Sequence, residues 1–262
     1  MGLAVKILEK EVWGGRLCLA RRVENIPGLT RPLSGRHVAA RMLTQARRKG
    51  LAMALEACKL IDYGDRCFYV NAAANTYTAR AVIIACGVQP KKLTVPGIEA
   101  AGNRLFYAWR ELPHRKGKRI AIIGGGEAAF DQACSLTEKG ASVTILMRGA
   151  APRAFPGLVQ EAKDLGVTIT TRAEITRAEM KGPLVSLQFT NAERPTCDAD
   201  YLLAAVGTSP TEVPISKSAA GKAGRGLYRA GDVCAGRYRQ AAIASGDGIK
   251  TAMIVYEYLR GE

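Results

Sequence analysis

Histidine is scarce in this sequence, and its cysteines lack the spacing of metal and redox centres. Of its 262 residues only two are histidines, His37 and His114, which argues against a histidine-rich metal site. Seven cysteines are present, but no two of them have Cys-x-x-Cys spacing. The sequence therefore predicts neither a zinc site nor a local redox dithiol, and no metal is expected.

Acidic residues and long apolar runs are also few. The chain has 38 Lys and Arg against 23 Asp and Glu, a formal net charge of +15, which suits anionic cofactors or an acidic partner protein. The basic residues are scattered and not interleaved with aromatics, so nucleic-acid binding is not expected. No apolar run reaches the about 20 residues that span a bilayer, and the start lacks a signal-peptide pattern. We expect a cytoplasmic protein without a membrane segment.

What the sequence does contain is an alternation of strand and helix patterns, typical of a doubly wound α/β fold. One compact nucleotide-binding unit is predicted to be inserted into another, with 113–199 inside a unit made of 1–112 and 200–262. The expected strands are at 4–9, 81–85, 118–123, 142–147, 167–171 and 201–205, with hairpin strands in 55–80 and a β-rich meander in 173–204. The expected helices are at 35–49, 127–139, 156–165 and 240–259.

The clearest motif is the glycine turn Gly124-x-Gly126-x-x-Ala129, which directly follows an apolar strand and opens a helix. The first glycine permits the sharp turn, the second lets the backbone approach a pyrophosphate, and Ala129 allows close packing of helix and strand. The helix dipole and free N–H groups, beginning near Glu127, favour phosphate. Strand, turn, helix and next strand fall within about 30 residues, which is the context expected for a dinucleotide site rather than a mere structural turn.

The next strand ends in Arg148, with Arg153 close behind. A site selective for NAD usually has an acid at this place for the ribose 2′-hydroxyl, whereas arginines suit a 2′-phosphate. The sequence therefore favours NADP(H), the alternative being that Arg148 only caps a surface turn.

Several strings, in order along nearly the whole chain, resemble those of the thioredoxin reductase-like flavoproteins. They are Gly14-Gly15 with VENIPG (23–28), VIIACG (82–87), IIGGGEAA (122–129), LLAAVGTSP (202–210), YRAGDV (228–233) and YRQAAIASGDG (238–248). The resemblance implies two Rossmann-like three-layer domains, one for FAD and one for NADPH, with hydride relayed through the flavin. It also implies homodimers, which are frequent in the family.

The resemblance also carries residue roles onto matching positions. Asp232 resembles the group that bonds the flavin ribityl chain, Asn25 the contact at the flavin edge and Glu9 the acid that holds the adenosine ribose. Taken singly, Asp232 is equally a helix or turn cap and Asn25 a turn former before Pro27. The remaining positions carried over as cofactor contacts are Gly15, Cys86, Gly87, Gly207, Gly231, Arg239, Gln240 and Ala241.

Two departures from the family pattern matter. Family members begin with a strand and a glycine-rich FAD phosphate loop ahead of the point where this sequence starts. We therefore expect an N-terminally truncated FAD domain that binds FAD poorly or not at all. In addition, Tyr107-Ala108-Trp109-Arg110 stands where the family's CxxC dithiol would be.

Without two thiols at this spacing, reduction of a disulfide by exchange is not expected. Tyr107 and Trp109 either stack near a cofactor or, as the favoured alternative, pack an interface. Cys86 and Cys134 are expected to be buried core thiols.

The leading hypothesis is an NADPH- and FAD-dependent oxidoreductase that passes electrons to an external acceptor. An acidic ferredoxin or flavodoxin suits the basic charge, and a quinone or another small molecule is equally compatible. No catalytic acid or base is predicted, because hydride transfer between cofactors needs orientation more than proton transfer. The alternative is a non-catalytic NADP(H)-binding remnant of a truncated flavoprotein.

Overall fold

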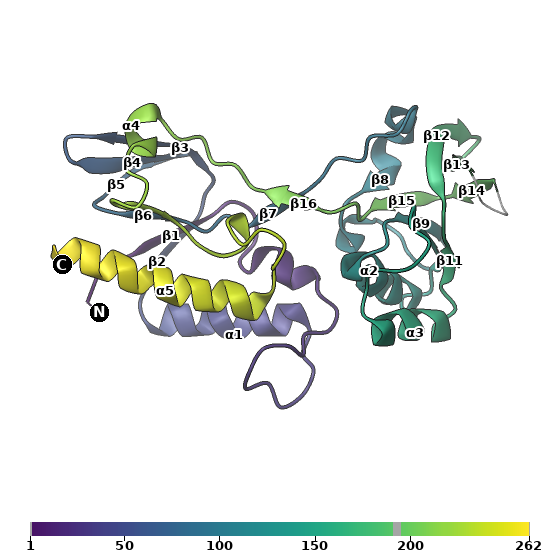
Figure 1. The fold of residues 1–262 in the computed structure, drawn as a ribbon, viewed down its shortest axis with the longest axis horizontal. Coiled ribbons are helices and arrows are strands. Elements are labelled where there is room, and N and C mark those ends of the chain that lie inside the picture. Colours follow the sequence, from purple (N-terminus) through teal and green to yellow (C-terminus); the bar gives the residue numbers. More distant parts are fainter. Residues whose placement is uncertain (1, 191–194, 262) are drawn as a thin grey trace. The chain divides into compact units, whose positions relative to one another are not determined.

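The chain folds into two compact units, seen in a computed structural model that describes residues 2–190 and 195–261 (Figure 1). Unit 1 consists of Met1–Cys18, Val23–Gln89 and Ser209–Glu262, and unit 2 of Leu19–Arg22 and Pro90–Thr208. Unit 2 thus also takes in 90–112 and 200–208, which the sequence analysis had placed in the first unit. Which cofactor each unit holds is a separate question, taken up below.

A five-stranded sheet forms the centre of unit 2, and every neighbouring pair in it is parallel. Its strands, in spatial order, are β11 (Thr168–Thr170), β10 (Ser142–Leu146), β9 (Arg119–Ile123), β15 (Tyr201–Ala204) and β8 (Leu105–Phe106). The helices α2 (Glu127–Thr137) and α3 (Pro156–Asp164) follow β9 and β10 along the chain. Each predicted strand and helix of this region is confirmed within a few residues.

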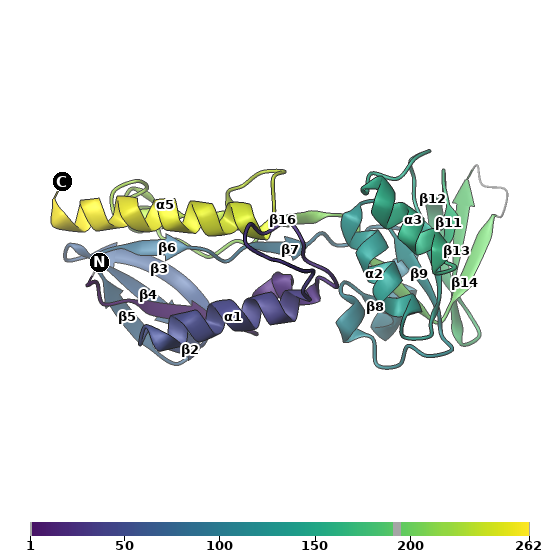
Figure 2. The ribbon, with the colours of Figure 1, turned by 90° about the horizontal axis from the view of Figure 1, so that it is seen from below.

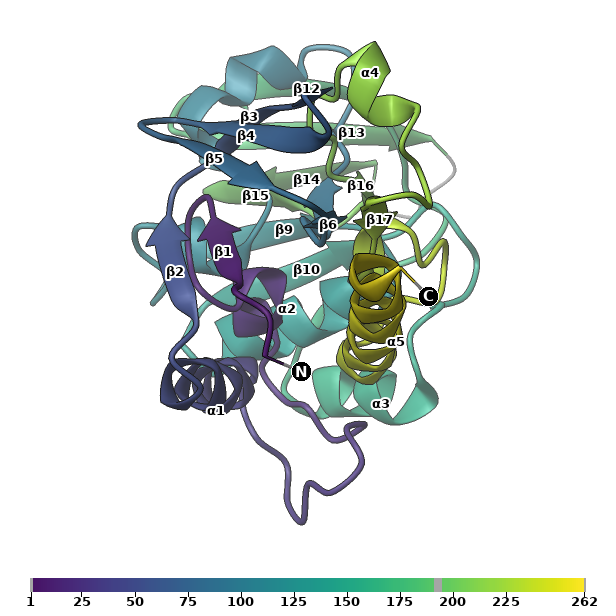
Figure 3. The same ribbon diagram turned by 90° about the vertical axis from the view of Figure 1, so that its left-hand side faces the viewer.

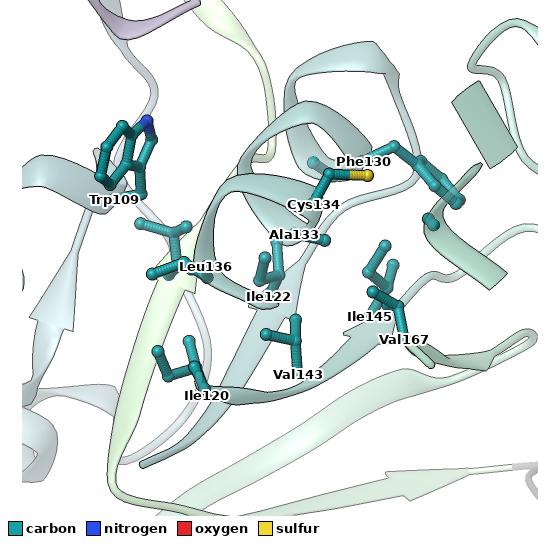
Figure 4. Packing of buried hydrophobic residues seen from close by; sticks show 14 of the residues in the cluster. Trp109, Ile120, Ile122, Phe130, Ala133, Cys134, Leu136, Val143, Ile145 and Val167 are labelled. Atoms are coloured by element: carbon teal, nitrogen blue, oxygen red, sulfur yellow. The ribbon is translucent and has the colours of Figure 1, made fainter. Parts of the chain in front are cut away.

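Alternate residues of β9 face opposite sides of the sheet, as a pleated strand requires. Ile120 and Ile122 pack with Phe130 and Leu136 of α2, as Figure 4 shows. Ala121 and Ile123 instead join a second cluster with β12 (Glu174–Lys181) and β13 (Leu184–Thr190). Unit 2 therefore has three layers: helices, a parallel sheet and an antiparallel sheet.

That antiparallel sheet is the meander predicted for 173–204. Its three strands are β12, β13 and β14 (Thr196–Ala199), paired in that order. Short 3-10 helices η2 (Ile98–Arg104) and η3 (Trp109–Glu111) precede the central sheet.

The segment Leu19–Arg22 belongs to unit 2 because its contacts are there. The indole N–H of Trp109 donates to the Leu19 carbonyl at 3.1 Å. The guanidinium of Arg21 pairs with Glu138 at 2.7 Å and Glu161 at 2.6 Å. Trp109 is 5% exposed and belongs to the core of unit 2, in keeping with packing rather than stacking on a cofactor.

Unit 1 has no sheet of comparable width among the residues described. Two of its sheets are two-stranded parallel pairs, another is an antiparallel meander, and β16 (Thr208–Pro210) pairs with β7 (Val88–Pro90). The parallel pairs are β1 (Lys6–Glu9) with β2 (Ala52–Leu55), and β6 (Val82–Ile84) with β17 (Leu227–Arg229). The meander consists of β3 (Cys58–Gly64), β4 (Cys67–Ala72) and β5 (Thr76–Ala79).

The β3–β4 hairpin turns on Asp65 and Arg66, within the range 55–80 in which hairpin strands are predicted. Both residues have positive φ, 50° and 63°. Two-residue hairpins favour this left-handed geometry because its twist matches that of the strands.

Two long helices flank the strands of unit 1 in Figure 2. The helix α1 (Gly35–Arg48) begins at Ser34, whose hydroxyl accepts the N–H of His37 at 3.3 Å. The helix α5 (Ala241–Arg260) follows the predicted range and ends at the left-handed Gly261. The remaining elements are η1 (Gly15–Leu19), β7 (Val88–Pro90), β16 (Thr208–Pro210), α4 (Lys217–Ala220) and η4 (Gly231–Val233).

Candidate functional site: two strand-end clusters

The glycine turn of unit 2 lies at the carboxyl end of β9, in the middle of the parallel sheet. Gly124 has φ of 145°, and its N–H donates to the Leu146 carbonyl at 2.9 Å. A Cβ on Gly124 would collide with the Ala205 carbonyl of the neighbouring strand connection. Only glycine therefore permits this crossing, as the motif predicted.

The two following motif positions differ from Gly124 in what surrounds them. Around Gly126, the N-cap of α2, a Cβ would meet nothing within 4 Å. Ala129, one turn on, is 0% exposed against the sheet. The turn is thus open toward solvent at Gly126 and tightly packed at Ala129, with Glu127 in the first turn of the helix.

The predicted arginines gather at the same edge of the sheet. Arg148 is exposed and comes two residues after the end of β10, the strand beside β9. The backbone N–H of Arg153, also exposed, donates to the Gly125 carbonyl at 2.8 Å, which fixes this segment beside the glycine turn. The structure therefore brings the glycine turn and a basic strand end together.

Gly207 lies beyond β15, the other neighbour of β9, with φ of 108°. Its carbonyl accepts the N–H of Lys91 at 3.0 Å. Sequence analysis missed Lys91, because nothing in its own sequence context marks it. Only the pairing of β7 with β16 brings it beside Gly207.

A second cluster lies at the carboxyl ends of β6 and β17 in unit 1. The N–H of Ala230 donates to the Ile84 carbonyl at 3.0 Å, so the two strand ends run side by side. Gly87 and Gly231 follow them with left-handed φ of 65° and 76°. The Gly231 N–H donates to Asp247 of α5 at 2.7 Å.

Asp232 follows directly, in η4. Burial raises the pKa of its carboxyl, while Arg239 and Arg16 lower it. Sequence analysis assigned no role to Arg16. Its position beside Asp232 depends on folding, because 216 positions of chain separate them.

The VENIPG and RQAAI segments also meet in unit 1. The side-chain amide of Asn25 donates to the side-chain oxygen of Gln240 at 2.8 Å. Gln240 is the N-cap of α5 and Ala241 its first residue, so this contact lies at the positive end of a helix.

Cys86 corrects one prediction. It is exposed rather than buried, and its thiol donates to the Thr211 carbonyl at 3.1 Å. The reason is that the buried part of β6 ends at Ile84, and the chain turns at Gly87. Cys134 is buried as predicted, and burial raises the pKa of its thiol to about 11.

Glu9 ends β1, as predicted, and accepts the N–H of Glu11 at 2.9 Å. Gly15 follows a turn in which its N–H donates to the Val12 carbonyl at 3.0 Å. The Glu9 side chain is thus bonded within its own segment, while its backbone carbonyl accepts the N–H of Glu56 at 2.6 Å.

Beside β1 lies a cluster that sequence analysis missed. The Glu56 carboxylate accepts the N–H groups of Ala74 and Asn75, the Asn75 amide and the Tyr77 hydroxyl. These hydrogen bonds lower the pKa of Glu56 to about 2, and the bond from the Ala74 N–H has the largest effect. Together with Lys6 and Lys10, this cluster lines a cavity of ≈ 640 Å³. No sequence motif predicts the Glu56 cluster, because a single glutamate after a strand is common in loops.

Among the described residues, no helix is long and apolar enough to cross a membrane. In the same residues no group of three or more histidine, cysteine or acidic side chains is placed to hold a metal ion. All seven cysteines are free.

Comparison with known proteins agrees with this arrangement. The family model described as pyridine nucleotide-disulphide oxidoreductase matches residues 2–248, so the chain belongs to that family. The thioredoxin reductase of Treponema pallidum is 28% identical, over 98% of this chain and 90% of its own length. Thioredoxin reductase 1 of Saccharomyces cerevisiae is 27% identical, over 94% of this chain and 86% of its own.

Solved structures give the same result for the fold. The crystal structure of T. acidophilum thioredoxin reductase matches with a TM-score of 0.84 and 28% identity, covering 98% of this chain and 90% of that one. Lactococcus lactis thioredoxin reductase matches with a TM-score of 0.86, 99% coverage of this chain and 92% of that one, at 23% identity. The fold class is thus confirmed: two Rossmann-like domains of an FAD- and NAD(P)H-dependent oxidoreductase.

Proposed function

We propose that the chain is an NADPH-dependent flavoprotein oxidoreductase whose acceptor is reduced without a CxxC dithiol. The observation that carries the nucleotide half is the turn at Gly124 and Gly126, with Arg148 and Arg153 at the same sheet edge. In this proposal residues 113–199 hold NADP(H). FAD is held by the predicted domain of residues 1–112 and 200–262.

The residues of unit 2 fit NADP(H). The open space at Gly126 admits a pyrophosphate to the backbone, and the start of α2 offers N–H groups and a positive dipole end. Glu127 lies in that first helical turn, and Gly207 borders the same edge. Arg148 and Arg153, both exposed, supply the charge for a 2′-phosphate.

The residues of unit 1 fit two parts of FAD. At the ends of β6 and β17, Gly87 has no atom within 4 Å of a Cβ position, so a ring can approach its backbone. Asp232, with the charge of Arg239 near it, would accept from a ribityl hydroxyl, and Cys86 precedes Gly87 at the end of β6. The N-terminus of α5 at Gln240 and Ala241, with Asn25 bonded to it, suits an electron-rich reduced ring.

The adenosine end of FAD has a candidate place beside β1. Glu9 ends β1, and Lys10 directly after it lines the ≈ 640 Å³ cavity beside Glu56. We propose that Glu9 holds the ribose and that the cavity takes the base. For the phosphates between these two ends, the described residues of unit 1 offer no Gly-x-Gly-x-x-Ala turn that joins a strand to an α-helix as in unit 2.

A bound flavin supplies two-electron acceptance from the nicotinamide and onward transfer in one- or two-electron steps. The protein residues orient both cofactors, and none of them has to transfer a proton. Because the seven cysteines contain no CxxC pair, the acceptor is proposed to be a ferredoxin or flavodoxin, a quinone or another small molecule. The net charge of +15 favours an acidic protein among these. A homodimer is part of the proposal.

The test is a visible spectrum of the purified chain with added FAD, before and after NADPH. A bound-flavin band that bleaches with NADPH, followed by reoxidation with an acceptor series, supports the proposal. A colourless protein that still binds NADPH would contradict the proposed binding of FAD but support the proposed binding of NADP(H).

One observation favours a second function, a non-catalytic NADP(H)-binding protein. It is the contrast between the complete glycine turn of unit 2 and the absence of an equivalent among the described residues of unit 1. In that case NADPH binds with unchanged affinity whether or not FAD is present.

A further inference from the structure

The helix α1 of unit 1 lies in a stretch of sequence that contains no acidic residue. From residue 25 to residue 55 there are six Lys and Arg and no Asp or Glu. The other long helices of the described chain, α2, α3 and α5, each contain at least two acidic residues. Part of the net positive charge is therefore concentrated on α1 and the segments beside it.

The basic side chains of α1 are not used for ion pairs within the folded chain. Arg36, Arg41, Arg47 and Arg48 are all exposed. Among the residues that the structure describes, none of these four guanidinium groups forms a salt bridge with a carboxylate. Internal salt bridges therefore do not account for these arginines.

The helix dipole accounts for only some of these charges. Arg47 and Arg48 lie in the last turn of α1, where the negative end of the dipole favours a cation. Arg36 is the second residue of the helix, and the first turn holds no acidic residue. Because a cation at the positive end of the dipole is unfavourable, Arg36 opposes helix stability, which favours a role for it outside the folded chain.

The four arginines form two rows along the exposed face of α1. At about 100° per residue, Arg36 and Arg47 lie about 20° apart around the helix axis, and so do Arg41 and Arg48. Arg36 and Arg47 are separated by about 16 Å along the axis. The exposed Ala40 lies between the two rows, so a partner can approach the helix backbone there while its anionic groups meet both rows.

The opposite face of α1 packs on a turn that belongs to the proposed flavin site. Val38 and Ala39 are 5% and 6% exposed. A Cβ on Gly14 would come within 2.5 Å of the Ala39 Cβ, so the helix lies directly against the turn that leads into Gly15. Figure 3 shows α1 end-on, below β2. A partner on the exposed face would be separated from this turn by about 10 Å, the diameter of one helix.

The composition of this face favours a carboxylate-bearing protein over other anionic partners. Residues 14–62 contain no Phe, Trp or Tyr, so this stretch has no aromatic platform on which the bases of a single-stranded nucleic acid can stack. Of the large apolar residues of α1 only Met42 is exposed, so the helix lacks the apolar face that insertion into a lipid surface needs. Guanidinium groups bind carboxylates through strong, paired hydrogen bonds.

We propose that the exposed face of α1, with Arg36, Arg41, Arg47 and Arg48, is the docking surface for an acidic electron-transfer protein. The inference rests on the proposed function, because the partner is its electron acceptor, and it gives that acceptor a place on the chain. Charge attraction of this kind speeds association and is screened by salt.

The probes are an acidic two-iron ferredoxin and an acidic flavodoxin, each titrated separately into the purified chain at low ionic strength by isothermal titration calorimetry. The variant Arg36→Glu/Arg41→Glu reverses one charge in each row. Lys163→Glu/Arg225→Glu is the matched control, because it changes the net charge equally at exposed positions outside α1. Glutamate at position 36 is favoured by the helix dipole, so the variant should remain folded, which circular dichroism checks.

We expect at least one probe to bind the parent and the control with similar affinity and the α1 variant about 10-fold or more weakly. Added salt should weaken binding to the parent more than binding to the variant, because screening acts on the charge pairs that the variant lacks. In NADPH-dependent reduction of the probe, the KM should rise about 10-fold in the variant, while reduction of a small quinone stays unchanged.

Four results would overturn the docking surface. The first two are no binding of either probe to the parent, and an equal loss of affinity in the variant and the control. The third is tighter binding of duplex DNA than of either probe, lost in the variant, which would assign the face to nucleic acid. The fourth is a change in the molecular mass of the unliganded chain in the variant, measured by light scattering, which would assign the face to a second copy.

The docking surface and the proposed function fail in different ways. Binding of a probe that depends on α1, without NADPH-dependent reduction of that probe, would support the docking surface and contradict the proposed function. Reduction of a probe that is unchanged in the α1 variant would support the proposed function and contradict the docking surface.

Discussion

Units 1 and 2 both contain parallel strands, but they differ in how these strands are buried. In unit 2, two clusters of 16 and 13 buried residues lie on the two sides of one sheet. The buried cluster of unit 1 has five residues, and β1 and β2 contribute none of them. Parallel strands are normally covered by layers on both faces, and β1 and β2, which have no buried residue, lack this cover in the described part of the chain.

The comparison also separates two roles of glycine at strand ends. Gly124 is required by close packing inside unit 2, whereas Gly126 and Gly87 leave space that a ligand can use. Substitutions at these positions therefore distinguish folding from binding.

The largest effect is expected from Gly124→Ala in unit 2. Its new Cβ would collide with the Ala205 carbonyl at a φ that alanine adopts with strain. We expect a loss of about 3 kcal/mol or more in the free energy of unfolding. Chemical denaturation followed by the fluorescence of Trp109, which lies in unit 2, measures it. A loss under about 1 kcal/mol would contradict the packing role of Gly124.

Gly126→Ala should separate binding from stability. A Cβ fits there without contact within 4 Å, so the free energy of unfolding should change by less than about 1 kcal/mol. The same Cβ stands in the path of the proposed pyrophosphate, and NADPH affinity should fall about 100-fold. Fluorescence titration with NADPH tests this. Unchanged affinity would exclude the turn as the phosphate site.

Arg148→Ala should weaken NADPH binding about 10- to 100-fold and leave NADH nearly unaffected, because only NADPH carries the 2′-phosphate. Lys163→Ala, an exposed cation on α3, is the control for net charge. Parallel titrations with both nucleotides give the ratio of the affinity loss for NADPH to that for NADH. An equal loss for both would contradict the NADP(H) assignment.

The smallest effect is expected from Glu56→Gln in unit 1. The pKa of Glu56 is lowered from 4.5 to about 2, so the carboxylate stabilises the folded state above pH 4.5 and this contribution disappears as the pH falls toward 2. The variant should be less stable than the parent at neutral pH, and the two should converge in acid. Thermal unfolding followed by circular dichroism across this range checks it, and a pH-independent difference would contradict the role of the charge.

The fold was largely predictable, because its signals are local. The apolar strand 118–123, the glycine turn and the helix after it each follow from neighbouring residues, and the structure differs only by a residue or two at their ends. The prediction for Cys86 was wrong because the apolar run VIIAC does not reveal where burial stops. The limits of the units lie elsewhere than predicted because they depend on which segments pack together, as Arg21 does with Glu138 and Glu161.

The sequence by itself determined the family, the α/β class and the glycine turn, because motif order and spacing are properties of the chain. Only the tertiary structure could place Arg16 beside Asp232, Asn25 on Gln240 and Glu56 on the turn at Ala74, since these contacts join distant segments. Edge pairing in a parallel sheet is made between strands far apart in the chain, and no local pattern encodes it.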